Sequence, residues 1–169
     1  MKKSFSDIEV KLSRQDFFYY NWVMAFERPT LPFLIYTLTA LALLSILGVF
    51  PWARSYALAA FVPLVGYFLW LWLSTQLLWQ KFAEEFRQTR QYSFYEEAYR
   101  TKIGAKNFDN PYAKLAKVIE SRQAFYLFHE NGQADILTKD ALLRAKESLE
   151  TMREFLGGRG LEPQKSTFL

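Results

Sequence analysis

Hydrophobic and polar residues are distributed very unevenly along this chain. Residues 31–50 carry no charged side chain, nor do residues 56–80, and a short segment that contains Arg54 separates them. About 20 consecutive apolar residues in a helix are long enough to cross the hydrocarbon core of a bilayer. The pattern therefore predicts a two-helix transmembrane hairpin, with spans at about 31–50 and 56–80. The alternative is a helical hairpin buried inside a protein. The remaining residues are too few to cover two wholly apolar helices well.

Residues 1–30 are predicted to form one strand and one aromatic helix next to the membrane. Apolar and charged residues alternate over 8–12, which is typical of a half-buried strand that pairs with a segment further along the chain. Ser13 is a favourable N-cap, and Asp16 falls in the first turn that would follow it. The aromatic residues of 17–26 then suit a helix at the level of the lipid headgroups.

Residues 81–158 contain many charged and polar residues, unlike the apolar segments before them, and are predicted to form a cytoplasmic domain. The helical pattern continues through 81–90, and alternating aromatic and aliphatic residues predict strands within 92–103. Residues 106–111 read as a turn-rich loop. The apolar residues of 113–120 fit a strand, although a helix remains possible there.

The clearest local signal is Asn131-Gly132, which lies between two strand-like runs, 125–130 and 133–138. Asn-Gly is the preferred sequence of a two-residue type I′ turn, so we predict a β-hairpin.

A last amphipathic helix is predicted to begin at Asp140. Apolar residues at spacings of three and four continue to Leu156, and Gly157-Gly158 would end the helix. Residues 159–169 are predicted to be a flexible tail. Several strands closed by one C-terminal helix are typical of a small α+β module of pleckstrin-homology-like design. The predicted fold class is therefore an α+β membrane protein, a transmembrane hairpin joined to such a module.

Three segments carry a resemblance to a known family: residues 111–121, 124–128 and 134–139. They resemble the C-terminal domain of the YcxB-like bacterial membrane proteins. The resemblance implies an N-terminal strand and helix, two adjacent spans, and a pleckstrin-homology-like cytoplasmic domain. The chain departs from the family pattern at Tyr112, where a Trp is frequent, and at 137–139, where Ile-Pro-Lys is frequent.

The basic residues around the two apolar segments predict the orientation in the membrane. Five precede the first segment and three closely follow the second, whereas the connecting segment carries only Arg54. By the positive-inside rule, both termini face the cytoplasm in a multi-pass protein of the bacterial inner (plasma) membrane. Tryptophans near the ends of the apolar segments are predicted to be interfacial anchors: Trp22, Trp52 and Trp79.

The net charge of +4 is explained by this topology and does not require a nucleic-acid partner, since the basic loops lack an aromatic stacking pattern. Basic residues just after the second apolar segment are candidates for contact with anionic lipid: Lys81, Arg87, Arg90, Arg100 and Lys102. Each could contribute about 1 kcal/mol if held at an anionic surface. The alternative is that they serve only to orient the protein.

No catalytic, cofactor-binding or metal-binding residue is predicted. The chain has no cysteine, and its single histidine, His129, is expected to be a solvated turn residue. The pairs Glu84-Glu85 and Glu96-Glu97 fit solvated faces better than acid–base catalysis. The glycines of 157–160 follow a helix, whereas a phosphate-binding loop precedes one.

These observations predict a non-enzymatic membrane protein that presents a cytoplasmic interaction module and scaffolds or regulates a membrane partner. The expected partners are the lipid bilayer and a membrane or cytosolic protein, or a second copy of the chain. The alternative is an accessory or immunity-type protein that acts through its hairpin on a transporter or a membrane-active peptide.

Overall fold

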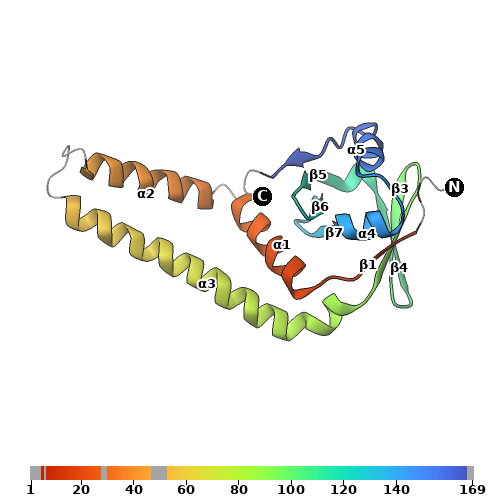
Figure 1. Ribbon diagram of the computed structural model, residues 1–169, viewed down its shortest axis with the longest axis horizontal. Helices are drawn as coiled ribbons and strands as arrows, with labels where there is room; N and C mark the ends of the chain where they lie inside the picture. The colour runs from red at the N-terminus through yellow and green to blue at the C-terminus, as the bar shows by residue number, and fades with distance from the viewer. Residues whose placement is uncertain (1–4, 6, 28–29, 47–52, 167–169) are drawn as a thin grey trace. The chain divides into compact units, whose positions relative to one another are not determined.

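The computed structural model describes residue 5 and residues 7–27, 30–46 and 53–166. The chain divides into two compact units (Figure 1). The sheet unit comprises Met1–Tyr20 and Glu84–Leu169, and the helical unit comprises Asn21–Ala83. In the described part of the sheet unit the strands form two four-stranded sheets, so the predicted α+β class is confirmed for this unit.

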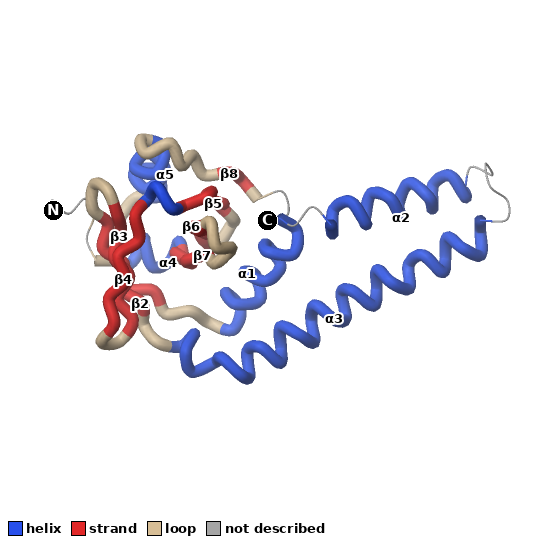
Figure 2. The backbone as a smooth tube through the Cα atoms, turned by 180° about the vertical axis from the view of Figure 1, so that it is seen from behind, coloured by secondary structure: helices blue, strands red, loops and turns tan. Residues whose placement is uncertain are grey.

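The first sheet is an antiparallel meander in the order β1-β2-β3-β4. Its strands are β1 (Ile8–Val10), β2 (Arg90–Phe94), β3 (Ala98–Ile103) and β4 (Lys106–Pro111). Figure 2 shows β2, β3 and β4 next to one another. The strand predicted at the N-terminus is confirmed, and its partner is β2, with Ile8 opposite Tyr92. Ile8 and Val10 are buried and Glu9 is exposed, as the alternating pattern requires.

The prediction of a loop over 106–111 is wrong, because these residues form β4 and pair with β3 along their whole length. β4 is an edge strand whose side chains are mostly exposed, so its sequence shows no alternation of apolar and polar residues. Cross-strand polar contacts stabilise it instead. Arg100 Nε donates to Asp109 Oδ1 (2.6 Å), and Asn110 Nδ2 donates to Thr101 Oγ1 (3.1 Å).

The second sheet has the order β7-β6-β5-β8. A short 3-10 turn, η1 (Tyr112–Lys114), leads into β5 (Leu115–Glu120), followed by β6 (Ala124–His129), β7 (Ala134–Thr138) and β8 (Gln164–Lys165). The strand prediction for 113–120 is confirmed from Leu115, and the helical alternative is wrong. β8 lies within the C-terminal segment and pairs in parallel with β5, with Gln164 opposite Ile119.

The hairpin predicted around Asn131-Gly132 is confirmed, but its turn is not a two-residue type I′ turn. Gly132 N donates to His129 O (2.9 Å), and His129 N donates to Gln133 O (2.8 Å). Gly132 has a φ of 80°, whereas Asn131 is not among the described residues with positive φ. The connection is therefore a three-residue loop that ends with a left-handed glycine.

The predicted single C-terminal helix is two helices, α4 (Lys139–Arg144) and α5 (Leu149–Gly157). The chain breaks between them at Lys146, whose φ is 60°, and Ser148 restarts the helix by accepting a hydrogen bond from Glu150 N (3.2 Å). The apolar face nevertheless packs as predicted at three positions that are fully or almost fully buried: Leu142, Met152 and Leu156.

The core of the sheet unit is rich in aromatic side chains. Tyr92, Phe94 and Tyr99 are fully buried on one face of the first sheet. The α5 side chain Phe155 meets Phe94 edge to face, with ring centroids 6.0 Å apart. Such contacts add to the free energy gained from burying the rings.

The helical unit contains α2 (Thr30–Ile46), most of α3 (Ala53–Arg87) and the second half of α1 (Arg14–Glu27). The predicted N-cap of α1 is confirmed: Asp16 N donates to Ser13 Oγ (3.2 Å) and Ser13 N donates to Asp16 Oδ2 (2.8 Å). Within the helical unit, Ala25 and Leu71 form a small buried cluster with partly buried aromatic and aliphatic side chains around it: Trp22, Phe26, Ile35 and Tyr67.

The predicted transmembrane hairpin over 31–80 is wrong. Across the residues that the structure describes, no helix combines the length and apolar character needed to cross a membrane. The uncharged segment extends to position 50, and α2, as described over Thr30–Ile46, has 17 residues. α3 runs on into the charged segment and carries Lys81 and Arg87 in its last turns.

Candidate binding pocket

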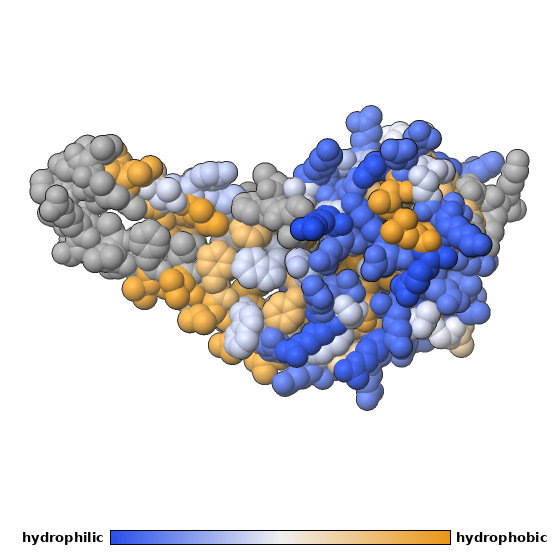
Figure 3. All heavy atoms as spheres, in the orientation of Figure 1, coloured by the Kyte–Doolittle hydropathy of each residue, from blue (hydrophilic) through white to orange (hydrophobic). Residues whose placement is uncertain are grey.

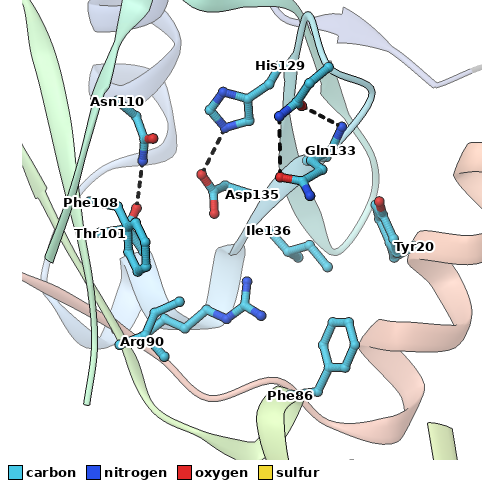
Figure 4. Close-up of a pocket in the computed structure, with 13 residues that line it drawn as sticks. Tyr20, Phe86, Arg90, Thr101, Phe108, Asn110, His129, Gln133, Asp135 and Ile136 are labelled. Carbon is cyan, nitrogen blue, oxygen red and sulfur yellow. Dashed lines mark hydrogen bonds and ion pairs between the residues drawn. The ribbon is translucent and has the colours of Figure 1, made fainter. Parts of the chain in front are cut away.

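The sheet unit contains a pocket of about 390 Å³ beside the β6–β7 hairpin. We call it the sheet pocket (Figure 4). The inner face of the first sheet forms one side, through Arg90, Thr101 and Phe108, and the hairpin and β7 form another, through His129 and Asp135. β4 and β7 are the outermost strands of their sheets, so the pocket is lined by two sheet edges.

A partly buried hydrogen-bond network surrounds Asp135, whose side chain is 15% exposed. Tyr99 Oη donates to Asp135 Oδ2 (2.7 Å), and Tyr92 Oη donates to Oδ1 (3.3 Å). His129 Nε2 lies 3.1 Å from Asp135 Oδ2 and 3.0 Å from Tyr99 Oη. Three side chains from three strands thus hold one carboxylate.

This network perturbs the acid–base properties of its members. Burial acts to raise the pKa of Asp135, but hydrogen bonds from His129 and Tyr99, together with the charges of His129 and Arg90, outweigh it, so the pKa is lowered. Burial and the neighbouring Asp135 raise the pKa of both Tyr92 and Tyr99 well above the ordinary value. Asp135 is therefore ionised and both tyrosines are neutral hydrogen-bond donors at neutral pH.

The prediction that His129 is a solvated turn residue is wrong. Its side chain is only 16% exposed, because the turn begins one residue later and His129 is the last residue of β6. Figure 4 shows the imidazole directed at Asp135. An aspartate within the apolar run of β7 was the one sequence signal for this network.

Arg90, the first residue of β2, extends from the first sheet into the pocket (Figure 4). Its guanidinium carbon lies 5.5 Å from the centre of the Phe86 ring, a cation–π contact. In the described part of the chain, Arg90 Nε is a buried nitrogen without a hydrogen-bond partner. The pocket therefore contains a cationic donor whose hydrogen-bonding capacity is not fully used.

The basic residues predicted to contact anionic lipid do not share one face of the sheet. Side chains alternate along a strand, so Arg100 and Lys102 project from β3 on the side opposite Thr101, whereas Arg90 faces the pocket. Arg100 forms an ion pair with Asp109 at 2.6 Å. Lys81 and Arg87 are exposed on α3.

The tryptophans predicted as interfacial anchors differ in their surroundings. Trp22 is partly buried and stacks on Phe26 and Phe68, with centroid distances of 5.7 and 5.6 Å. Trp79 is 8% exposed. Trp52 lies outside the described residues. Their role as anchors stays a prediction.

The lining of the pocket suits the binding of a small polar or charged group with an apolar part. Arg90 supplies a positive charge, Asn110 and Gln133 supply amide groups, and Phe86 and Phe108 supply apolar surface. The described residues contain no cluster of three or more acidic or histidine side chains that could hold a metal ion.

The arrangement of strands closed by C-terminal helices defines the sheet unit as a small α+β domain. Residues 94–156 match the family model described as YcxB-like protein. The matched region extends from the end of β2 to α5. The resemblance to the YcxB-like family drawn from the sequence is therefore confirmed over residues 94–156. The matched region includes Tyr99, His129 and Asp135, whereas Arg90 precedes it. No curated protein matches the chain.

Proposed function

We propose that this protein is a non-enzymatic, membrane-associated protein whose sheet unit is an interaction module for a protein partner at the cytoplasmic face of the bacterial inner membrane. One observation carries the proposal: large apolar side chains are exposed along α2 and α3. They are Phe33, Tyr36, Leu43, Leu44, Val62, Val65, Leu69, Trp70, Trp72, Leu73, Leu77 and Leu78. In the view of Figure 3, apolar residues gather along these helices, and polar residues cover most of the sheet unit.

Such a surface favours removal from water. Burial of one large apolar side chain contributes about 1.5–3 kcal/mol, so covering this set is worth on the order of 10 kcal/mol even if each is only half exposed. Single folded proteins rarely leave a contiguous apolar patch of more than a few hundred Å² in contact with water.

Lipid fits this surface better than a protein partner does. Trp70 and Trp72 are two positions apart, so they project from nearly opposite sides of α3, and both are exposed. A partner helix would cover one stripe, whereas acyl chains can cover apolar side chains on several sides. The basic residues Lys81 and Arg87 follow on the same helix, where they would favour an anionic surface.

Vesicle flotation tests the association with lipid. The full chain is transferred from detergent to vesicles of phosphatidylethanolamine and phosphatidylglycerol and centrifuged through a density gradient. We expect the protein to float with the vesicles and the double variant W70E/W72E to lose at least about 90% of the bound fraction, because charges at these positions oppose burial in lipid. L143E is the matched control, because Leu143 is 59% exposed but lies on α4 of the sheet unit. A wild-type chain that stays folded and monomeric at the bottom of the gradient would refute the proposal.

The open edge of β4 supports the role of the sheet unit in protein binding. β4 is the last strand of its sheet, and its side chains are mostly exposed. An extended segment of a partner could add to this edge as a further strand. A photo-crosslinking residue in place of Asn107, in the middle of β4, should give a discrete crosslinked species in cells. The same residue in place of the exposed Ala116 on β5 should not, and equal yields at both positions would exclude the edge of β4 as the contact.

A further inference from the structure

The sheet pocket has an unusual donor at its centre. Arg90 stands opposite Ile103 in the β2–β3 pair, so its side chain leaves the sheet on the same face as Tyr92 and Thr101. On that face it reaches into the pocket, and its Nε is buried without a hydrogen-bond partner. Leaving a buried donor unsatisfied is destabilising, and more so for a charged group. An anion that pairs with this guanidinium would offset that cost.

The nearest carboxylate does not satisfy Arg90 directly. Asp135 accepts hydrogen bonds from Tyr99 and Tyr92, and its Oδ2 lies 3.1 Å from His129 Nε2. No ion pair that includes Arg90 is found in the described parts of the chain. The carboxylate still contributes a negative charge to the pocket. A ligand with a single negative charge is therefore favoured over a doubly charged phosphate, which Asp135 would repel more strongly.

The walls beside Arg90 are apolar. Phe86 lies under the guanidinium, and Phe108, Ile103 and Ile136 line the same pocket. The volume of about 390 Å³ falls in the range typical of pockets that bind small molecules. The pocket therefore contains one guanidinium group, that of Arg90, with a hydrophobic surface next to it.

We propose that the sheet pocket binds a small monocarboxylate with an apolar stem. The carboxylate pairs with the guanidinium of Arg90, in the planar two-bond geometry that guanidinium and carboxylate groups share. The stem packs against Phe86, Phe108 and Ile136. This site is separate from the apolar side chains that carry the proposed membrane association.

The experiment uses the full chain in lipid nanodiscs, with 3-phenylpropionate as the probe and its uncharged amide and inorganic phosphate as comparisons. Methyl NMR spectra report binding at Ile103 and Ile136, which line the pocket. We expect 3-phenylpropionate to shift both methyl signals in a saturable manner. The amide and phosphate should bind at least about tenfold more weakly, since each lacks either the charge or the stem.

Substitutions at Arg90 then assign the contact. R90Q removes the charge and R90K keeps it without the planar fork, so both should weaken 3-phenylpropionate at least about tenfold. K102Q is the matched control, because Lys102 is an exposed basic residue on the opposite face of the neighbouring strand. Flotation of R90Q with vesicles should equal that of the wild type, which separates this site from the membrane proposal.

Three results would overturn the site. The amide could bind as tightly as the acid, the shifts could avoid Ile103 and Ile136, or K102Q could weaken binding as much as R90Q. Should R90Q fail to fold, R90K and the wild-type comparison of acid with amide still decide the question.

Discussion

Glu120 at the end of β5 is a buried carboxylate that pairs with two basic side chains. It is 7% exposed, and Arg153 of α5 donates to both of its oxygens, from Nη2 to Oε1 (2.7 Å) and from Nε to Oε2 (2.8 Å). Lys139, the first residue of α4, also donates to Oε1. One carboxylate therefore ties the second sheet to both C-terminal helices, and we predict that E120Q destabilises the sheet unit.

The magnitude follows from the pKa of Glu120. Hydrogen bonds from Arg153 outweigh the opposing effect of burial and, with the hydrogen bond and charge of Lys139, lower this pKa from 4.5 to about 2. A difference of that size corresponds to about 3 kcal/mol of stability at neutral pH. Arg153 is 42% exposed, so water screens part of its charge, and we expect a loss of about 1–3 kcal/mol.

The pH dependence has a definite sign. Because the pKa is lower in the folded chain, the stabilisation is complete above 4.5 and is lost as the pH falls from 4.5 towards 2. E120Q lacks the titrating group. The difference in free energy of unfolding between wild type and E120Q should therefore be largest at neutral pH and fall to less than about half by about pH 3.

Native-state hydrogen exchange of the β5 and β6 amides, corrected for intrinsic exchange at each pH, measures this difference. E97Q is the control, because Glu97 is exposed and its substitution should change stability by no more than about 0.5 kcal/mol. A difference between wild type and E120Q that stays constant between pH 7 and pH 3 would refute the electrostatic explanation.

Two further predictions concern the hairpin and the pocket. Y99F removes the donor 2.7 Å from Asp135 Oδ2, so the pKa of Asp135 should rise and the free energy of unfolding at neutral pH should fall by about 1–3 kcal/mol. NMR titration measures the pKa, and hydrogen exchange measures the stability. As the control, Y95F should leave the pKa of Asp135 unchanged. G132A places a side chain on a backbone with φ of 80° and should lower the free energy of unfolding by about 1 kcal/mol. G157A, in helix α5, is the control and should be neutral or stabilising. Equal effects of the two substitutions would show that the left-handed turn does not require glycine.

Elements of the fold that depend on neighbouring residues could be predicted from the sequence. The strand at Ile8–Val10 alternates in polarity, and the hairpin contains Asn-Gly, so each carries its own signal. β4 could not be predicted, because both of its faces are largely exposed and pairing with β3 alone makes it a strand. The break at Lys146 was also hidden, since its positive φ occurs at a residue type that does not favour it.

The sheet pocket depends on contacts between distant strands. Tyr92 and Tyr99 lie 43 and 36 positions from Asp135 in the sequence, and no local pattern predicts that they share its carboxylate. Arg90 was singled out for its charge, but its direction depends on the β2–β3 register. The transmembrane prediction failed for a different reason. It rested only on the absence of charged residues along a segment, and that absence does not determine where a helix begins and ends.

The pairing of β1 with β2 makes the helical unit an insertion between two adjacent strands of one sheet. Ile8 and Val10 leave the ribosome before the helices, but their partners on β2 follow only after the last turn of α3. β1 therefore cannot pair with β2, and its apolar side chains cannot be buried against β2, until the whole insertion has been synthesised. Closure of the first sheet is thus a late event in biosynthesis, and it brings the two ends of the inserted helices together.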